Sequence, residues 1–380
     1  MYFKLNPECY FIKGKTRGAI FDLIEGKIFA LNRHETEIIT HCERNECVNG
    51  GDEFLRDLKQ RCLGNFYSKK TYIQKLRIGS PIEKQQIGRP PQLYRAFLEI
   101  NNSCNRNCWF CGYYGIKRSL GCIGCNKWNG DGESLDIKRW NEIIDELRLL
   151  DCRNIYITGG DLTISWDRTI DILNCTTGKF IDIYLIIHRQ NLSENVLCDL
   201  PKDVKLIIQT ENANDIHDDG FTYLLISNPL VKLDPRIILN KNILLDYVID
   251  DVNYVTSDLP IMSKSKIHSQ SIYQFLNNIE YHPCLGHTLA ICYNGDVIPC
   301  PMMRHHVLGN VRLRKLHTIF KNWDAGINKF WTLNLDKIEK CTDCEFRYVC
   351  NDCRALEERL TGKLEGKRLC NYDPRKGMWL

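Results

Sequence analysis

Three cysteines lie close together in a pattern that suits metal binding. Cys104, Cys108 and Cys111 are separated by three and then two residues, and this spacing can bring three thiolates to one face of a loop. Thiolates are ligands for iron–sulfur clusters and for zinc. In a four-iron cluster, three protein ligands would leave one iron open to a small molecule. The stretch therefore predicts a metal site with an open position; a zinc site or three core thiols are the plainer alternatives.

A second set of cysteines lies in the last hundred residues. The chain has 20 cysteines in 380 residues, and a reducing compartment disfavours disulfides, so metal binding or catalysis is the first expectation. Two C-x2-C pairs in this set also occur in zinc ribbons, which keeps zinc as an alternative. The set comprises Cys284, Cys300, Cys341, Cys344, Cys350, Cys353 and Cys370.

The elements that must position the first three cysteines alternate between strands and helices from residue 94 to 280. One helix is predicted by the apolar spacing of Trp140, Ile143 and Leu147. Alternation of this kind predicts a parallel sheet and an α/β fold, here a partial (β/α)6 TIM-like barrel. Active residues of such barrels follow the carboxyl ends of the strands. The predicted strands cover 96–100, 155–158, 183–187, 204–208, 223–226 and 243–245.

The first cysteine motif resembles the signature of radical S-adenosylmethionine enzymes, in which the aromatic Phe110 precedes the last cysteine. A second resemblance follows at the next strand, where Gly159, Gly160 and Asp161 stand where the family usually has Gly-Gly-Glu. The family resemblance implies a [4Fe-4S] cluster on the three cysteines, whose free iron chelates S-adenosyl-L-methionine. It implies that the glycine motif contacts the methionine ammonium, and that the reduced cluster releases a 5′-deoxyadenosyl radical.

Polar residues at the ends of later strands are candidates for contacts with the nucleoside that this resemblance implies. His188 follows the third strand, Gln209 and Glu211 follow the fourth, and Ser227 follows the fifth. Gln209 ranks first because it directly follows an apolar run. Each of them could equally be a solvated loop residue.

The second cysteine set resembles the SPASM extension of peptide- and protein-modifying radical enzymes, which binds two auxiliary [4Fe-4S] clusters. The resemblance departs at one spacing, where two residues rather than three separate Cys350 from Cys353. The resemblance implies an outer cluster on Cys341, Cys344, Cys350 and Cys370 and an inner cluster on Cys284, Cys300 and Cys353. With three ligands, one iron of the inner cluster stays open unless Cys292 supplies a fourth ligand. A half-buried core thiol is the plainer role for Cys292.

The first part of the chain predicts a separate α+β module over residues 1–85. A β-hairpin over 19–31 turns at Glu25-Gly26, a helix begins at Arg33, and another helix covers 54–62. This order resembles the winged-helix precursor-recognition element of enzymes that modify ribosomally made peptides, which takes the leader peptide as an added strand. Glycines and prolines over 78–91 predict a linker, and residues 281–380 form the cysteine-rich extension.

Composition excludes several classes of protein. Lys and Arg number 51 against 47 Asp and Glu, which disfavours a nucleic-acid partner held by bulk charge. No apolar run suits a membrane span, and residues 1–15 lack the apolar stretch of a signal peptide, so a cytoplasmic protein is expected. A zinc-binding winged-helix regulator is thereby the weaker alternative.

Together the modules resemble a radical S-adenosylmethionine peptide maturase. The predicted function is hydrogen abstraction from a core residue of a precursor peptide, installing a thioether or carbon–carbon crosslink. The implied partners are the peptide, with its leader on residues 1–85, and an electron donor such as flavodoxin or ferredoxin. A peptide epimerase and an anaerobic sulfatase-type protein maturase are the alternative enzymes.

The remaining cysteines have no assigned ligand role. Cys122 and Cys125 form a C-x2-C pair after the first motif, and a redox pair, a hydrogen-atom donor, a metal site and an incidental loop pair all remain open. Cys152, Cys175 and Cys198 are expected to be core residues.

Overall fold

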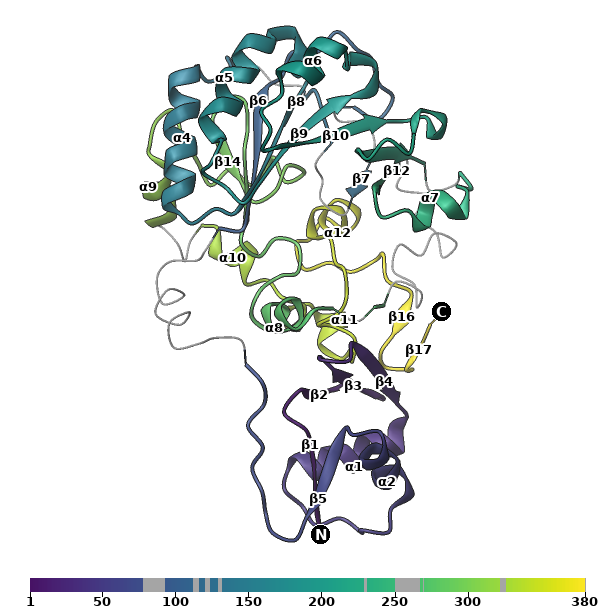
Figure 1. The fold of residues 1–380 in the computed structure, drawn as a ribbon. Coiled ribbons are helices and arrows are strands. Elements are labelled where there is room, and N and C mark those ends of the chain that lie inside the picture. Colours follow the sequence, from purple (N-terminus) through teal and green to yellow (C-terminus); the bar gives the residue numbers. More distant parts are fainter. Residues whose placement is uncertain are drawn as a thin grey trace.

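The computed structural model describes residues 1–77, 93–111, 116–119, 124–128, 132–228, 231–249, 267–268, 270–321 and 326–379. Within them, ten strands form one sheet in the order β15-β14-β13-β6-β8-β9-β10-β11-β12-β7 (Figure 1). The predicted linker over 78–91 and Cys122 lie outside the described residues. The strands of this sheet are β6 (Arg95–Asn101), β7 (Ile116–Ser119), β8 (Asn154–Gly159), β9 (Asp182–His188), β10 (Val204–Thr210), β11 (Thr222–Ser227), β12 (Ile243–Ile249), β13 (Thr288–Ile291), β14 (Asp296–Ile298) and β15 (Gly309–Asn310).

The six predicted strands are confirmed as β6 and β8 to β12, which run parallel to one another. A seventh parallel strand, β13, pairs with β6. The sheet therefore continues beyond residue 280 into the cysteine-rich part of the chain. The edge strands β15 and β7 do not pair with each other in the described residues, so the fold is an open, partial barrel.

Side chains of the parallel strands alternate between two apolar layers. Leu98, Ile157 and Leu185 pack against the helices, whereas Phe97 and Ile186 from the same strands face the barrel interior. Burial on both faces explains why these strands read as continuous apolar runs.

Helices cover the outer face of the sheet, as Figure 1 shows for α4, α5 and α6. The predicted helix is confirmed as α4, whose Trp140, Ile143 and Leu147 are buried. The Asp136 side chain accepts from the Arg139 N–H and caps its first turn. The helices after the N-terminal unit are α4 (Ile137–Leu149), α5 (Trp166–Thr176), α6 (Glu194–Asp199), α7 (Pro235–Leu239), α8 (Ile272–Glu280), α9 (Leu316–Lys321), α10 (Asn328–Trp331), α11 (Glu339–Thr342) and α12 (Arg354–Thr361).

The N-terminal residues form a small α+β unit, here called the N-terminal unit (residues 1–77). The predicted hairpin is confirmed as β3 and β4, and Gly26 in its turn has φ +65°. Asn32 and Glu35 form a reciprocal capping box at the start of α1. The elements are β1 (Tyr2–Leu5), β2 (Cys9–Lys13), β3 (Gly18–Asp22), β4 (Lys27–Leu31), α1 (Arg33–Glu43), α2 (Glu53–Gln60) and β5 (Gly64–Tyr67).

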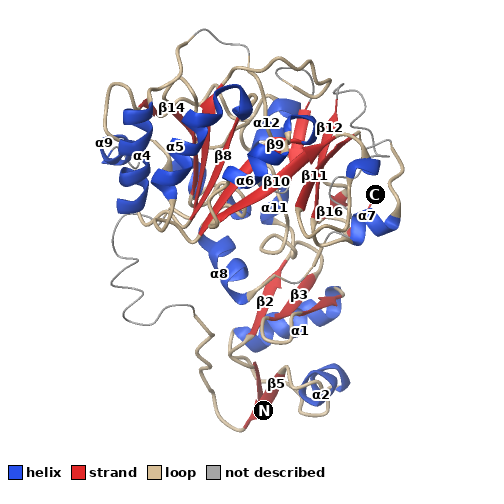
Figure 2. Ribbon diagram, turned by 45° about the horizontal axis from the view of Figure 1, so that its top comes forward, coloured by secondary structure: helices blue, strands red, loops and turns tan. Residues whose placement is uncertain are grey.

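One face of the β2-β3-β4 sheet packs against the C-terminal part of the chain. Phe21 and Ile12 share an apolar cluster with Phe275 of α8 and with Val349, and Figure 2 shows α8 beside β2 and β3. The Lys15 N–H donates to the Asp343 carbonyl at 2.8 Å. The N-terminal unit is thus attached through a shared core.

We expect the cysteines of the N-terminal unit to differ sharply in reactivity. Cys9 and Cys42 are buried, and burial raises the pKa of each thiol to about 12, while Cys47 and Cys62 are exposed. At pH 8 a thiol with that pKa is ionised in roughly one molecule in 10⁴, and the thiolate is the nucleophile. Of these four cysteines, timed labelling of the folded protein with iodoacetamide, followed by peptide mass spectrometry, should modify only Cys47 and Cys62. Equal labelling of all four would contradict this.

The three cysteines expected in the core of the barrel differ in burial. Cys152 is buried and Cys175 is half-buried, but Cys198 on α6 is exposed, so the expectation for Cys198 was wrong. Helix α6 has six residues and buries only Val196, and Cys198 lies two residues farther along, on another face.

No helix in the described part of the chain has the length and apolar character needed to cross a membrane.

Candidate metal centres

The first three cysteines lie in the loop that follows β6, at the carboxyl end of the parallel strands. Backbone N–H groups already point at two of the sulfurs: Lys127 donates to Cys111 Sγ at 2.9 Å and Arg106 donates to Cys104 Sγ at 3.4 Å. Burial raises the pKa of the Cys104 and Cys108 thiols. N–H donors to sulfur favour the thiolate that a metal requires. The loop is therefore suited to a thiolate-bound metal.

The glycine motif at the end of β8 packs directly against this loop. A Cβ on Gly160 would lie 2.3 Å from the Ser103 carbonyl oxygen, and one on Gly159, which has φ +154°, would lie 2.6 Å from the Asn101 carbonyl oxygen. A hydrogen bond also joins the end of β8 to the loop: the Asp161 N–H donates to the Ser103 carbonyl at 2.7 Å. The two glycines are thus required for the close approach of strand and loop.

The Asp161 side chain has a local role. Its Oδ1 accepts hydrogen bonds from the Thr163 N–H at 3.0 Å and from the Thr163 hydroxyl at 2.7 Å. These bonds fix the carboxylate beside the loop at the start of the short helix Leu162–Ser165. The other carboxylate oxygen, Oδ2, takes part in neither bond.

Replacing Gly160 by alanine is expected to displace the cysteine loop. A Cβ at 2.3 Å from backbone oxygen has to move strand or loop, and a shift of about 1 Å at a reactive site costs on the order of 100-fold in rate. We expect that loss in the 5′-deoxyadenosine formation that the resemblance to radical S-adenosylmethionine enzymes implies.

The matched control is Gly178→Ala, at a glycine with φ +68° and no atom near its Cβ position. It should cost about 1–2 kcal/mol of stability through backbone strain and leave the rate near that of the wild type. Equal rates for both variants would contradict the argument.

Residues 124–128 cross the carboxyl ends of the strands and are held there by side chains from two of them. The Thr158 hydroxyl donates to the Gly124 carbonyl at 3.2 Å. Gln209 is fully buried; its Oε1 accepts from the Cys125 N–H at 2.8 Å, and its Nε2 donates to Cys125 Sγ at 3.0 Å. The Gln209 amide was expected to contact the nucleoside; in the structure it forms hydrogen bonds with Cys125.

His188 and Glu211 meet at the ends of β9 and β10. His188 is 3% exposed, and its Nδ1 accepts from the Gln190 N–H at 3.2 Å. The proton is therefore on Nε2, which donates to Glu211 Oε2 at 2.7 Å. Ser227 ends β11, and its hydroxyl donates to the Asn228 carbonyl at 3.3 Å.

The barrel interior is lined mainly by apolar side chains. Phe110 is 2% exposed and belongs to this lining, against which Cys108 and Cys125 also pack. Cys292 belongs to it as well, just after β13, whereas Cys284 precedes β13. A four-residue strand is about 13 Å long, so Cys292 and Cys284 lie toward opposite ends of the sheet. The full lining comprises Phe97, Phe110, Ile186, Ile207, Leu224, Ile226, Val248, Ala290, Cys292 and Ile298.

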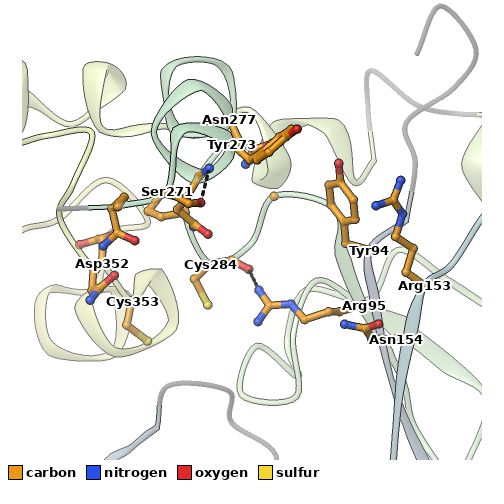
Figure 3. Close-up of a pocket in the computed structure, with 15 residues that line it drawn as sticks. Tyr94, Arg95, Arg153, Asn154, Ser271, Tyr273, Asn277, Cys284, Asp352 and Cys353 are labelled. Atoms are coloured by element: carbon orange, nitrogen blue, oxygen red, sulfur yellow. Dashed lines mark hydrogen bonds between the residues drawn. The ribbon is translucent and has the colours of Figure 1, made fainter. Parts of the chain in front are cut away.

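Three of the later cysteines meet on the amino-terminal side of the sheet. Cys284, Cys300 and Cys353 line one small cavity of about 20 Å³ between β13 and α12. Cys284 and Cys353 also border a larger cavity of about 560 Å³, shown in Figure 3. There Arg95 Nη2 donates to the Cys284 carbonyl at 2.9 Å. Side chains from three distant parts of the sequence thus converge on one place.

The other four cysteines converge on a second place. Cys341, Cys350 and Cys370 share one buried cluster. Burial raises the pKa of Cys344 well above its usual value, and the nearby Cys350 and Cys341 thiols raise it further. Four cysteines that lie close together match the ligand number of a closed cluster.

Comparison with known families follows this division of the chain. Residues 98–212 match the model of the Radical SAM superfamily, and residues 284–345 match that of the SPASM iron-sulfur cluster-binding domain. The chain carries a radical SAM domain followed by a SPASM domain. The SPASM match ends before Cys350, Cys353 and Cys370.

Similar solved structures include three of SuiB from Streptococcus suis, each 14% identical in sequence and covering 97% of this chain and 100% of SuiB. SuiB alone has a TM-score of 0.49, SuiB bound to precursor peptide SuiA 0.48, and SuiB bound to S-adenosylmethionine 0.47. No curated protein matches the chain.

The radical SAM and SPASM domains imply S-adenosyl-L-methionine and iron–sulfur clusters, and the donor sets fit them. The radical SAM loop offers three thiols with N–H donors aimed at two of the sulfurs. The SPASM region offers one group of three cysteines and one group of four. Thiolates without carboxylate or imidazole partners are typical iron–sulfur ligands.

A buried network of charges in the SPASM region joins its two cysteine groups. Asp352, between Cys350 and Cys353, accepts from Lys367 Nζ at 2.6 Å, from Arg354 Nη2 at 2.7 Å and from His282 Nε2 at 3.0 Å. Burial alone would raise the pKa of Asp352, but the Lys367 and Arg354 charges hold it well below its usual value. The network fixes the segment that supplies one cysteine to each group.

Several residues around the radical SAM loop carry little signal in the sequence. Arg304 pairs with the buried Glu99 of β6 at 2.7 Å and lies 4.3 Å from the Trp128 ring centre. The Trp128 N–H donates to Asn102 Oδ1 at 2.7 Å. The only available signal was Glu99, a charged residue within a predicted buried strand.

Proposed function

We propose that this chain is a radical SAM enzyme that modifies a ribosomally made precursor peptide by installing a thioether or carbon–carbon crosslink. Residues 1–85 would be a winged-helix-like unit that binds the leader, 94–280 the catalytic barrel, and 281–380 the cluster-bearing extension, which also adds strand β13 to the barrel sheet. An external donor such as flavodoxin or ferredoxin would supply electrons.

The observation that carries this proposal is the free edge of β4 in the N-terminal unit. Within the described residues β4 pairs only with β3, so the backbone groups on its other edge are available to an added strand. The same sheet shares its core with the SPASM region through Phe21, Phe275 and Val349. A peptide bound at β4 is therefore anchored to the part of the chain that bears the cysteine groups.

Three clusters would be present: one on Cys104, Cys108 and Cys111, an outer one on Cys341, Cys344, Cys350 and Cys370, and an inner one on Cys284, Cys300 and Cys353. When bound, the reduced first cluster and S-adenosyl-L-methionine supply a 5′-deoxyadenosyl radical that abstracts hydrogen from carbon. Gly159 and Gly160 shape the loop, Asp161 lies beside it, and the apolar interior with Phe110 excludes water. His188, Gln209, Glu211 and Ser227 border the site.

Co-expression with the short open reading frames beside the gene tests this function. The expected product has lost two hydrogens per crosslink, located by tandem mass spectrometry, and requires the leader. A peptide that binds and stays unmodified while 5′-deoxyadenosine forms would overturn the proposal.

A peptide epimerase is a second candidate because of Cys125. Its thiol packs against the apolar interior and is held by Gln209. In epimerisation the S–H bond of Cys125 would break, the hydrogen atom would pass to the substrate α-carbon radical, and the external donor plus a proton would restore the thiol. Unchanged peptide mass in H₂O, one added deuterium in D₂O, and loss of product in Cys125→Ala would establish this candidate.

A further inference from the structure

We propose that the groove between β4 and the C-terminal hairpin binds an extended peptide segment and selects a lysine or arginine side chain through Glu345. The inference rests on the proposed function, because the precursor peptide is the occupant. The hairpin consists of β16 (Tyr372–Asp373) and β17 (Met378–Trp379). Figure 1 shows it next to β4.

The groove has a volume of about 400 Å³ and two unlike walls. One wall is β4, which contributes Ile28 and Ala30, and the other is the hairpin, which contributes Met378 and Trp379. Phe29 of β4 packs instead on the core of the N-terminal unit, so Ile28 and Ala30 lie on the groove side of the strand. A strand added along β4 would place every second side chain in this groove.

One end of the groove is closed by Arg17. Its Nε donates to the Leu31 carbonyl at the end of β4 at 3.2 Å, and its Nη1 donates to the Gly377 carbonyl before β17 at 3.3 Å. Both walls are therefore linked through the Arg17 side chain.

Glu345 supplies the specificity. It lines the groove and is only 1% exposed. Its Oε1 accepts from the Tyr372 hydroxyl, whereas Oε2 is buried with no hydrogen-bond partner. A buried carboxylate oxygen without a donor is costly. A lysine or arginine side chain from the peptide would satisfy it.

Apart from Arg17 and Tyr372, the remaining lining is mainly apolar and includes Ile28, Phe346 and Trp379. The segment that fits is therefore an extended one in which a lysine or arginine is flanked, two residues away on either side, by apolar residues. Side chains between them would point away from the groove.

A phage-displayed library of random 16-residue peptides, selected on the full-length cluster-loaded protein, tests the inference. We expect enrichment of a cationic residue flanked by apolar residues at two-residue spacing. Glu345→Gln should weaken binding of a selected lysine peptide about 10-fold or more, and should barely affect the same peptide with methionine in place of lysine. Unchanged iron content would show that the neighbouring Cys344 site is intact.

Ala30→Arg provides a second variant that does not touch the cluster region. It places a long side chain in the groove and should abolish binding, while Glu25→Arg, in the exposed turn before β4, should not. No enrichment, or selected peptides indifferent to both Glu345→Gln and Ala30→Arg, would overturn the inference. If the enzyme modifies a precursor that does not bind in the groove, this inference is wrong and the proposed function is still supported. If peptides bind in the groove but no precursor is modified, this inference is supported and the proposed function is wrong.

Discussion

Replacing Cys104, Cys108 and Cys111 together by alanine is expected to abolish 5′-deoxyadenosine formation and to lower the iron content by about four per chain. The reason is that these residues form one loop with its own N–H donors, separate from the two cysteine groups of the SPASM domain. Iron and sulfide analysis, together with chromatography of the nucleoside product, measures both effects.

The control for this variant is Cys198→Ala, because Cys198 is exposed on α6 and outside all three cysteine groups. It should retain full iron content and full 5′-deoxyadenosine formation. An iron content in the triple variant equal to that of the wild type would mean that the loop does not hold a cluster. A loss of all iron would mean that the three sites do not form independently.

Replacing Asp352 by alanine is expected to lower the stability of the SPASM region by about 3–5 kcal/mol, the range for breaking a buried ion pair by removing one partner. Asp352 is the shared acceptor of Lys367 and Arg354, and its side chain and that of Arg354 are completely buried. The substitution leaves both cations in the interior without it. Thermal unfolding should show a Tm lower by roughly 10 °C, with loss of iron from the SPASM sites.

Asp343→Ala is the matched control at the surface. Asp343 lies 3.8 Å from Arg375, whose side chain is 70% exposed, and such pairs contribute about 0–1 kcal/mol. An Asp352→Ala protein as stable as this control would show that the buried network does not support the segment between Cys350 and Cys353.

Much of the barrel could be predicted because many of its strands and helices have a recognisable pattern within their own short stretch of sequence. Strands buried on both faces appear as apolar runs, as at Ile183 to Ile187 in β9, and α4 repeats its apolar residues with helical period. The first cysteine group was predictable for another reason: its candidate ligands, Cys104, Cys108 and Cys111, belong to one loop and therefore lie close together in sequence.

The remainder depends on contacts between residues far apart in the chain. Nothing near Gln209 indicates that its amide is bonded to Cys125, and nothing near Asp352 indicates that His282 and Lys367 surround it. Such pairings carry no period and no fixed spacing. The same holds for β13, whose place beside β6 is set by pairing of Thr288 with Arg95, although its sequence neighbours are SPASM cysteines.

The position of β13 has a consequence for biosynthesis. β6 is synthesised early, yet one of its edges remains bare until β13 has left the ribosome. Until then the nascent chain exposes an unpaired edge of a strand that is later internal, a state prone to association with other chains. The strand that leads into the cysteine loop is therefore fully paired only after β13 has been synthesised. Cluster insertion at Cys104, Cys108 and Cys111 is therefore expected to wait until residues up to Ile291 have left the ribosome.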